Sequence, residues 1–160
     1  MLNPDAAQIL RAIEETLVDV VEPTVTATSA RSALATIGHL LRHAVLRIEA
    51  GDGVLMADIA ASGALLARLA AYYRDAGDAA QAEAIDAVLA TGNAPLTGRA
   101  AMLRGAVQEA LIDLQAKRPA RGDDAAYRAA RADIREYLRG QLEQEAALIH
   151  PAFADKGPRR

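Results

Sequence analysis

Two histidines stand four residues apart in a segment whose apolar residues recur at helical spacing. His39 and His43 therefore lie one turn apart on one face of a predicted helix. Such a pair could share a metal ion or an anionic ligand, but a metal site in a helical bundle also needs a carboxylate or a third imidazole. The sequence has no Glu-x-x-His or His-Glu-x-x-His motif. We therefore predict no metal here and interpret the pair as a surface feature or as a contact for a ligand or partner.

Four arginines recur at intervals of three, four and four residues near the end of the chain. They are Arg128, Arg131, Arg135 and Arg139, and on a helix they form one stripe. Like charges at this spacing repel by about 0.2–0.5 kcal/mol per pair, so something anionic must face the stripe. The first interpretation is internal, with carboxylates supplied by Glu15, Asp19, Glu22 and Asp124. The alternative is a phosphate-bearing ligand or an acidic partner surface, since arginine binds both with paired hydrogen bonds.

Glu145 is a third candidate for chemistry. On a helical wheel of about 100° per residue it projects from the side that carries Ile134 and Leu138. An acid in an apolar setting has a raised pKa, as a general acid or base requires. The chain has no phosphate-binding glycine-rich loop, no Gly-x-Ser-x-Gly elbow, no dinucleotide-binding fingerprint and no paired Asp/Glu motif with metal spacing. The sequence therefore assigns no catalytic residue, predicts no cofactor and disfavours an autonomous enzyme.

The elements that must position these residues are predicted to be helices. By count, 39 of the 160 residues are alanine and 19 are leucine, while aromatic residues make up 3%, so the intrinsic preference is helical almost throughout. Capping residues, prolines and glycines divide the chain into segments. The predicted helices span about residues 4–22, 24–51, 52–75, 78–91, 97–118 and 123–151.

These segments predict an all-α fold, namely an up-and-down antiparallel bundle of about six helices. We expect a single domain over residues 1–155, followed by a disordered basic tail at 156–160. The segment from Ile59 to Tyr73 is apolar nearly all round, which predicts a central, buried helix. Its alanines at every third or fourth position would let a neighbouring helix, or a second subunit, approach closely.

Composition excludes several classes of function. The absence of cysteine removes disulfides, thiolate metal sites and cysteine nucleophiles. Eighteen basic residues against 21 acidic ones give no general electrostatic case for binding nucleic acid. The most apolar window, residues 59–73, includes Arg68 and is shorter than the ~20 residues needed to span a bilayer. The first residues lack the pattern of a secretory signal, so we expect a cytoplasmic protein without a membrane partner.

The first 50 residues resemble a known family. The residues that carry this resemblance are 3–14 (NPDAAQILRAIE), Leu17, the segment 20–23 (VVEP), the segment 30–34 (ARSAL) and the segment 47–49 (RIE). This pattern is similar to that of small bacterial helical proteins encoded beside aminoglycoside-phosphotransferase-like kinases, among them the small subunit that accompanies the hydroxyacyl-CoA kinase of levulinate catabolism. The resemblance implies an accessory subunit that binds and supports such a kinase, with the catalytic residues on the partner.

Two functions follow as hypotheses. The first is a non-catalytic accessory protein that docks a larger metabolic enzyme, a kinase or another acyl-CoA-linked enzyme, and that could also form a homodimer. The alternative is a helical bundle that binds a small molecule or a metal, or acts as a small enzyme, through His39, His43 and Glu145.

Overall fold

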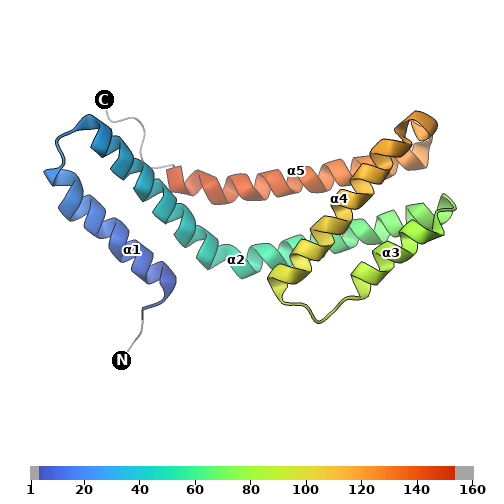
Figure 1. Cartoon of the computed structure of the whole chain (residues 1–160), viewed down its shortest axis with the longest axis horizontal. Coiled ribbons are helices and arrows are strands. Elements are labelled where there is room, and N and C mark those ends of the chain that lie inside the picture. The colour runs from blue at the N-terminus through green and yellow to red at the C-terminus, as the bar shows by residue number, and fades with distance from the viewer. Residues whose placement is uncertain (1–3, 154–160) are drawn as a thin grey trace. The chain divides into compact units, whose positions relative to one another are not determined.

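A computed structural model describes residues 4–153 of the chain, and all of its regular elements are helices (Figure 1). The elements are α1 (Ala6–Thr16), the π-helical turn η1 (Leu17–Val21), the 3-10 turn η2 (Glu22–Thr24), α2 (Thr28–Asp75), α3 (Ala79–Ala90), α4 (Leu96–Arg121) and α5 (Ala125–Phe153). The described residues include no strand, which confirms the all-α prediction. There are five α-helices among them rather than about six, and the predicted tail at 156–160 lies outside the described residues.

The difference in helix number arises at Gly51. We predicted that Gly51 ends one helix and that Asp52 or Gly53 begins the next, but α2 continues through all three residues. A glycine ends a helix when it adopts the left-handed conformation, and otherwise it only weakens the helix by about 1 kcal/mol. Among the described residues only Gly77 has a positive φ, of 78°, and α2 ends just before it. The predicted boundary at residue 51 was therefore wrong, and the predicted helix end at about residue 75 is confirmed.

Other helix boundaries agree with the predicted ranges to within a few residues. Asp78 caps α3 by accepting a hydrogen bond from the backbone N–H of Gln81, at the start of the helix predicted for about residues 78–91. The α4 helix begins at Leu96, after Pro95, rather than at Thr97. It also continues past Arg118 to Arg121, with a proline in its last turn, so the predicted break comes three residues too early.

Contacts divide the chain into two compact units. The hairpin unit comprises residues 1–51 and 144–160, and the core unit comprises residues 52–143. The extent of a single domain over residues 1–155 stays a prediction. Each unit is described here by itself.

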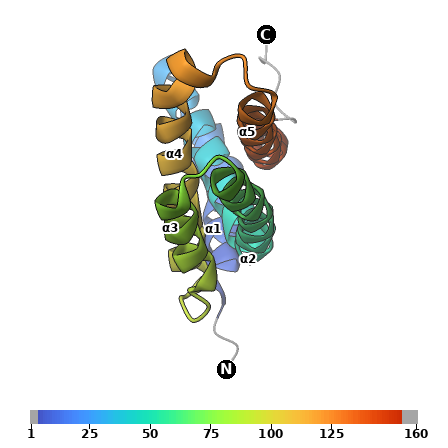
Figure 2. The same ribbon diagram turned by 90° about the vertical axis from the view of Figure 1, so that its right-hand side faces the viewer.

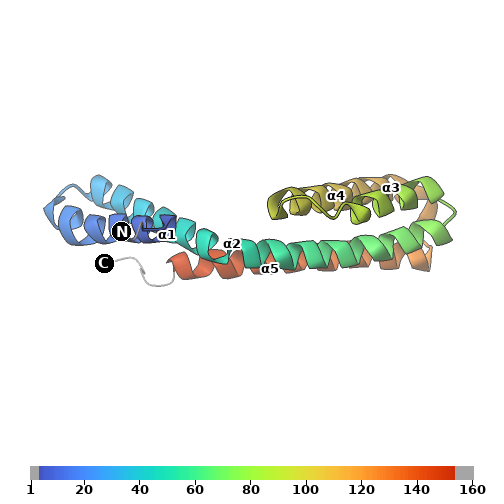
Figure 3. The same cartoon turned by 90° about the horizontal axis from the view of Figure 1, so that it is seen from below.

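The core unit is built around apolar side chains from four helices. Figures 2 and 3 show the α3–α4 pair covering one side of the pair formed by α5 and the second half of α2. The largest fully buried apolar side chains between them are Leu65, Leu66, Leu69, Tyr73, Leu103, Leu114, Tyr127 and Ile134. Burying a side chain of this size contributes about 1.5–3 kcal/mol to folding, so this cluster is the main source of stability in the core unit.

Only one face of the apolar part of α2 is buried. Leu65, Leu66 and Leu69 are inaccessible to solvent, whereas the alanines at positions 60, 64, 67 and 71 are exposed. The prediction of a helix buried on all sides was therefore wrong. An alanine side chain is one methyl group and gains little from burial, so an alanine face can stay in solvent although it raises the hydropathy of the segment.

The described residues contain one helix, α2, that is long and apolar enough to cross a membrane by length and composition, and the core helix of a soluble protein passes the same test. Two charged residues, Asp58 and Arg68, lie in its apolar part. Asp58 pairs with Arg104 of α4 and Arg68 pairs with Asp133 of α5. Both charges are thus used in packing contacts between helices of the core unit.

Candidate functional site

His43 and Glu145 lie on either side of one arginine in the hairpin unit. Arg47 donates from Nε to Nε2 of His43 over 3.2 Å, and its Nη2 lies 2.6 Å from Oε2 of Glu145. The Glu145 side chain is 46% exposed. The end of α5 therefore places this acid against a guanidinium group near solvent rather than in an apolar setting. A role for Glu145 in binding or catalysis stays a prediction.

His39 contacts a different arginine of the same helix. Nη2 of Arg42 lies 2.7 Å from Nδ1 of His39, and Nη1 of Arg42 pairs with Glu14 of α1 over 3.1 Å. A guanidinium group has only donors, so in both histidines the contacted ring nitrogen is the acceptor. The lone pair that would bind a metal is occupied there. Among residues 4–153 no group of three or more His, Cys, Asp or Glu side chains could hold a metal ion.

Large apolar side chains are exposed over the hairpin unit. They are Ile9, Ile13, Val18, Val20, Ile37, Leu40, Ile48 and Ile149. Among the described residues of this unit the only buried hydrophobic residues are Ala7 and Val45, and all the others belong to the core unit. Single exposed apolar residues are normal on a protein surface, but a cluster marks an interaction site.

Four of these side chains share one side of the hairpin, and we call them the hairpin apolar face: Ile9, Ile13, Ile37 and Ile48. On wheels of about 100° per residue, the stripe on α1 and the stripe on α2 are each turned by roughly a quarter turn from the line of contact between the helices. The two helices run in opposite directions here, as the pairs Arg42–Glu14 and Arg11–Glu49 show (Figure 1). The two stripes therefore face the same side.

Asp58 forms a buried polar network that the sequence did not indicate. Its side chain is 4% exposed. Oδ1 accepts hydrogen bonds from the Tyr137 hydroxyl at 2.8 Å and from Nε2 of Gln141 at 2.9 Å, while Oδ2 lies 3.2 Å from Nε of Arg104. Burial, together with the hydrogen bond to Asp58, raises the pKa of Tyr137 above its ordinary value. With three donors satisfied, the carboxylate joins α2, α4 and α5 and has a structural role.

A second polar cluster joins α2, α3 and α4. Nζ of Lys117 lies 2.5 Å from Asp78 and 2.8 Å from Asp113, and the Tyr73 hydroxyl donates to Asp113 over 2.8 Å. Burial is the main cause that raises the pKa of Tyr73, and the hydrogen bond to Asp113 adds to it. Burial opposes the charge of Lys117, but its two carboxylate partners outweigh this and raise its pKa. The hydrogen bond from Lys117 lowers the pKa of Asp78.

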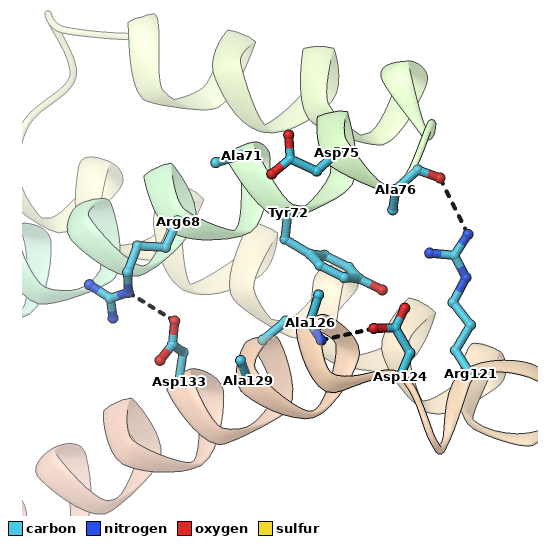
Figure 4. A pocket seen from close by; sticks show the side chains of 11 residues that line it. Arg68, Ala71, Tyr72, Asp75, Ala76, Arg121, Asp124, Ala126, Ala129 and Asp133 are labelled. Atoms are coloured by element: carbon cyan, nitrogen blue, oxygen red, sulfur yellow. Dashed lines mark hydrogen bonds and ion pairs between the residues drawn. The ribbon is translucent and has the colours of Figure 1, made fainter.

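A pocket of about 410 Å³ lies within the core unit beside Tyr72 (Figure 4). Five of its eleven lining residues are alanine, and charged side chains, among them Arg68, Asp75 and Arg121, stand around it. The Tyr72 hydroxyl is buried and has no hydrogen-bond partner.

Replacing Tyr72 with phenylalanine is expected to raise the free energy of unfolding by about 0.5–1 kcal/mol, because it removes a buried hydroxyl that lacks a partner. Tyr73→Phe is the matched control, since it removes a hydroxyl that donates to Asp113 and should lower the free energy of unfolding by about 1–2 kcal/mol. Urea unfolding followed by circular dichroism measures both. A loss of stability in Tyr72→Phe equal to that in Tyr73→Phe would show that the Tyr72 hydroxyl is bonded.

The arginine stripe lies along a groove of about 250 Å³ in the core unit. The groove is lined by Arg118, Gly122, Tyr127, Arg128, Arg131 and Arg135. Arg139 follows on the same helix but does not line it. The acid expected to pair with the stripe from within this unit, Asp124, instead accepts hydrogen bonds from the first backbone N–H groups of α5. The predicted pairing with Glu15, Asp19 and Glu22 would join the two units and stays a prediction.

Within residues 52–143, no carboxylate lies at ion-pairing distance from the groove arginines; the ion pairs of this unit use other basic residues, Arg68, Arg74, Arg104 and Lys117. The sequence pattern did not indicate Arg118 as a member of this site, because Arg118 stands on the preceding helix and falls outside the periodic stripe.

We find no family model, no curated protein and no solved structure that matches this chain. The function is therefore inferred from the exposed faces and grooves of the chain itself.

Proposed function

We propose that this protein is a non-catalytic accessory subunit that docks a larger enzyme through the hairpin apolar face. The observation that carries the proposal is the contrast among the described residues of the hairpin unit, where eight large apolar side chains are exposed and the buried hydrophobic residues are only Ala7 and Val45. Exposed apolar clusters of this kind are unfavourable in water and mark surfaces that a partner covers.

The hairpin holds its face in a fixed geometry. Arg42 pairs with Glu14 and Arg11 pairs with Glu49, so two ion pairs cross between α1 and α2. A capping box in which Asp5 and Gln8 exchange hydrogen bonds fixes the start of α1. A surface that is already ordered loses less conformational entropy when it binds, which favours affinity.

The chemistry of the face specifies its occupant. On the helical wheels its borders are formed by small uncharged residues, Ala12, Thr16, Ala33 and Ala44. An uncharged face with small borders is complementary to an apolar helix face of another protein, because a charged surface would lose hydration without gaining a partner.

The resemblance of residues 3–50 supplies the first enzyme to test. It points to an aminoglycoside-phosphotransferase-like kinase that acts on hydroxyacyl-CoA, with the reaction carried out on that partner. A cytoplasmic location, without a membrane partner, follows from this proposal. The contacts of His39, His43 and Glu145 with arginine side chains support a non-catalytic role.

The test is binding between this chain and an aminoglycoside-phosphotransferase-like kinase of the same organism, measured by calorimetry with purified proteins. We expect a stable complex, and we expect Ile13→Glu and Ile48→Glu to weaken it by about 30-fold or more each, since a central apolar contact contributes about 2 kcal/mol or more to binding. Ile112→Glu is the matched control, because Ile112 is 57% exposed on α4 in the core unit. This variant should bind as the unchanged protein does.

Two outcomes would contradict the proposal. One is the absence of binding to the kinase by a folded chain, with helicity checked by circular dichroism. The other is a dimer of this chain that Ile13→Glu dissociates, since a second copy would then occupy the face.

A further inference from the structure

The groove between the end of α4 and the beginning of α5 has the composition of an anion site. Four guanidinium groups, from Arg118, Arg128, Arg131 and Arg135, line it together with Gly122 and Tyr127, and no carboxylate does. Arginine presents its donors in a planar fork that matches a phosphate or carboxylate with two parallel hydrogen bonds. Four such forks around one groove can satisfy several oxygens at once.

The position of these arginines on α5 is unfavourable for the helix alone. Arg128 lies in the first turn of α5, and Arg131 lies in the next. The N-terminal end of a helix carries a partial positive charge, so cations there cost stability whereas anions are favoured. Repulsion between arginines three and four residues apart adds to this cost. An anion in the groove would offset both effects.

Several contacts hold the groove in place without neutralising it. The Tyr127 side chain is buried, and its hydroxyl donates to the backbone carbonyl of Leu114 over 2.6 Å. The guanidinium carbon of Arg131 lies 5.9 Å from the centre of the Tyr127 ring. Nη1 of Arg128 donates to the backbone carbonyl of Asp123 over 3.0 Å. These arginines are therefore positioned by an aromatic ring and a neutral carbonyl, and no carboxylate within residues 52–143 forms an ion pair with them.

We propose that this groove binds the phosphate groups of a small phosphorylated compound, with two linked phosphates as the minimal ligand. At about 250 Å³, the groove is smaller than the ~300–1,000 Å³ of sites that enclose a whole drug-sized molecule. It is therefore suited to a compact, highly charged group rather than to an acidic protein segment. The site belongs to the core unit and is independent of the hairpin apolar face.

The test is calorimetric titration of the full chain with inorganic pyrophosphate at about 0.15 M salt, where exposed charges are screened beyond about 8 Å. We expect saturable binding with one site per chain. Arg131→Gln and Arg135→Gln should each weaken it by at least about 10-fold. Arg139→Gln is the matched control, because Arg139 is on the same stripe but does not line the groove, and it should change affinity by less than about 2-fold.

Further ligands identify the source of the phosphate. Tighter binding of ADP than of pyrophosphate would indicate a phosphate ester, whereas equal binding would indicate that the phosphates alone are recognised, and both results support the site. An acidic peptide of glutamates that binds more tightly than pyrophosphate would overturn the proposal in favour of a protein contact. Equal loss of affinity in all three arginine variants would overturn it too, since it would show only a general ionic attraction.

Discussion

Replacing Asp58 with alanine is expected to lower the free energy of unfolding by about 3 kcal/mol. The substitution leaves Tyr137 and Gln141 without their acceptor, and it removes the charge that faces Arg104. Buried donors that lose a partner cost about 1–3 kcal/mol each, and hydrogen bonds to a charged group are the stronger ones. Because Arg104 is half exposed, water compensates for part of its loss. Urea unfolding, with the slope checked against the unchanged protein, measures the difference.

The variant Asp58→Asn distinguishes the contribution of the hydrogen bonds to the free energy of unfolding from the contribution of the charge. Asparagine keeps one oxygen that can accept from Tyr137 and Gln141, but its amide group faces Arg104 as a second donor. We expect a loss of about 1–2 kcal/mol, smaller than that of the alanine variant. If both variants unfold like the unchanged protein, Asp58 does not join the helices of the core unit.

Replacing Tyr127 with alanine is expected to lower the free energy of unfolding by about 3–5 kcal/mol, the range for large aromatic side chains removed from a core. Tyr127 is 1% exposed and stands in the first turn of α5. Its ring contacts the guanidinium group of Arg131, and its hydroxyl bonds to the carbonyl of Leu114. The substitution should therefore also disturb the groove, and pyrophosphate binding should weaken together with stability.

Tyr127→Phe is the control for the ring. It keeps the packing and the contact with Arg131 and removes the hydrogen bond to Leu114, so we expect a loss of about 1 kcal/mol. Equal losses in the phenylalanine and alanine variants would mean that the hydroxyl, and not the ring, stabilises the start of α5.

Helix content was predictable from the sequence, while several helix boundaries were not. The side chain of Asp78 and the left-handed Gly77 act locally, so their effects can be read from neighbouring residues. The effect of Gly51 depends on a backbone conformation that packing of the whole helix decides, because the cost of a helical glycine is only about 1 kcal/mol. A local signal of that size is easily outweighed by tertiary contacts.

The candidate sites were predictable only in part, for a related reason. The arginine stripe has a helical period and could be found, but Arg118 approaches it from another helix. Asp58 bonds to residues 79 and 83 positions away, and no local pattern connects residues so distant. In the sequence, the one signal of the Asp58 network was that Asp58 is a single acid inside an apolar segment. The hairpin apolar face could not be separated from a core stripe, because periodicity shows which residues share a side but not whether that side is covered.

Hydrogen exchange of this chain, with and without a saturating amount of the kinase, tests the docking proposal most directly. We predict slower exchange on binding in α1 and in residues 37–48, which carry the hairpin apolar face, and unchanged exchange in α3 and α4. Protection confined to the core unit, or no protection anywhere in the chain, would contradict the proposal that this protein docks an enzyme through the hairpin.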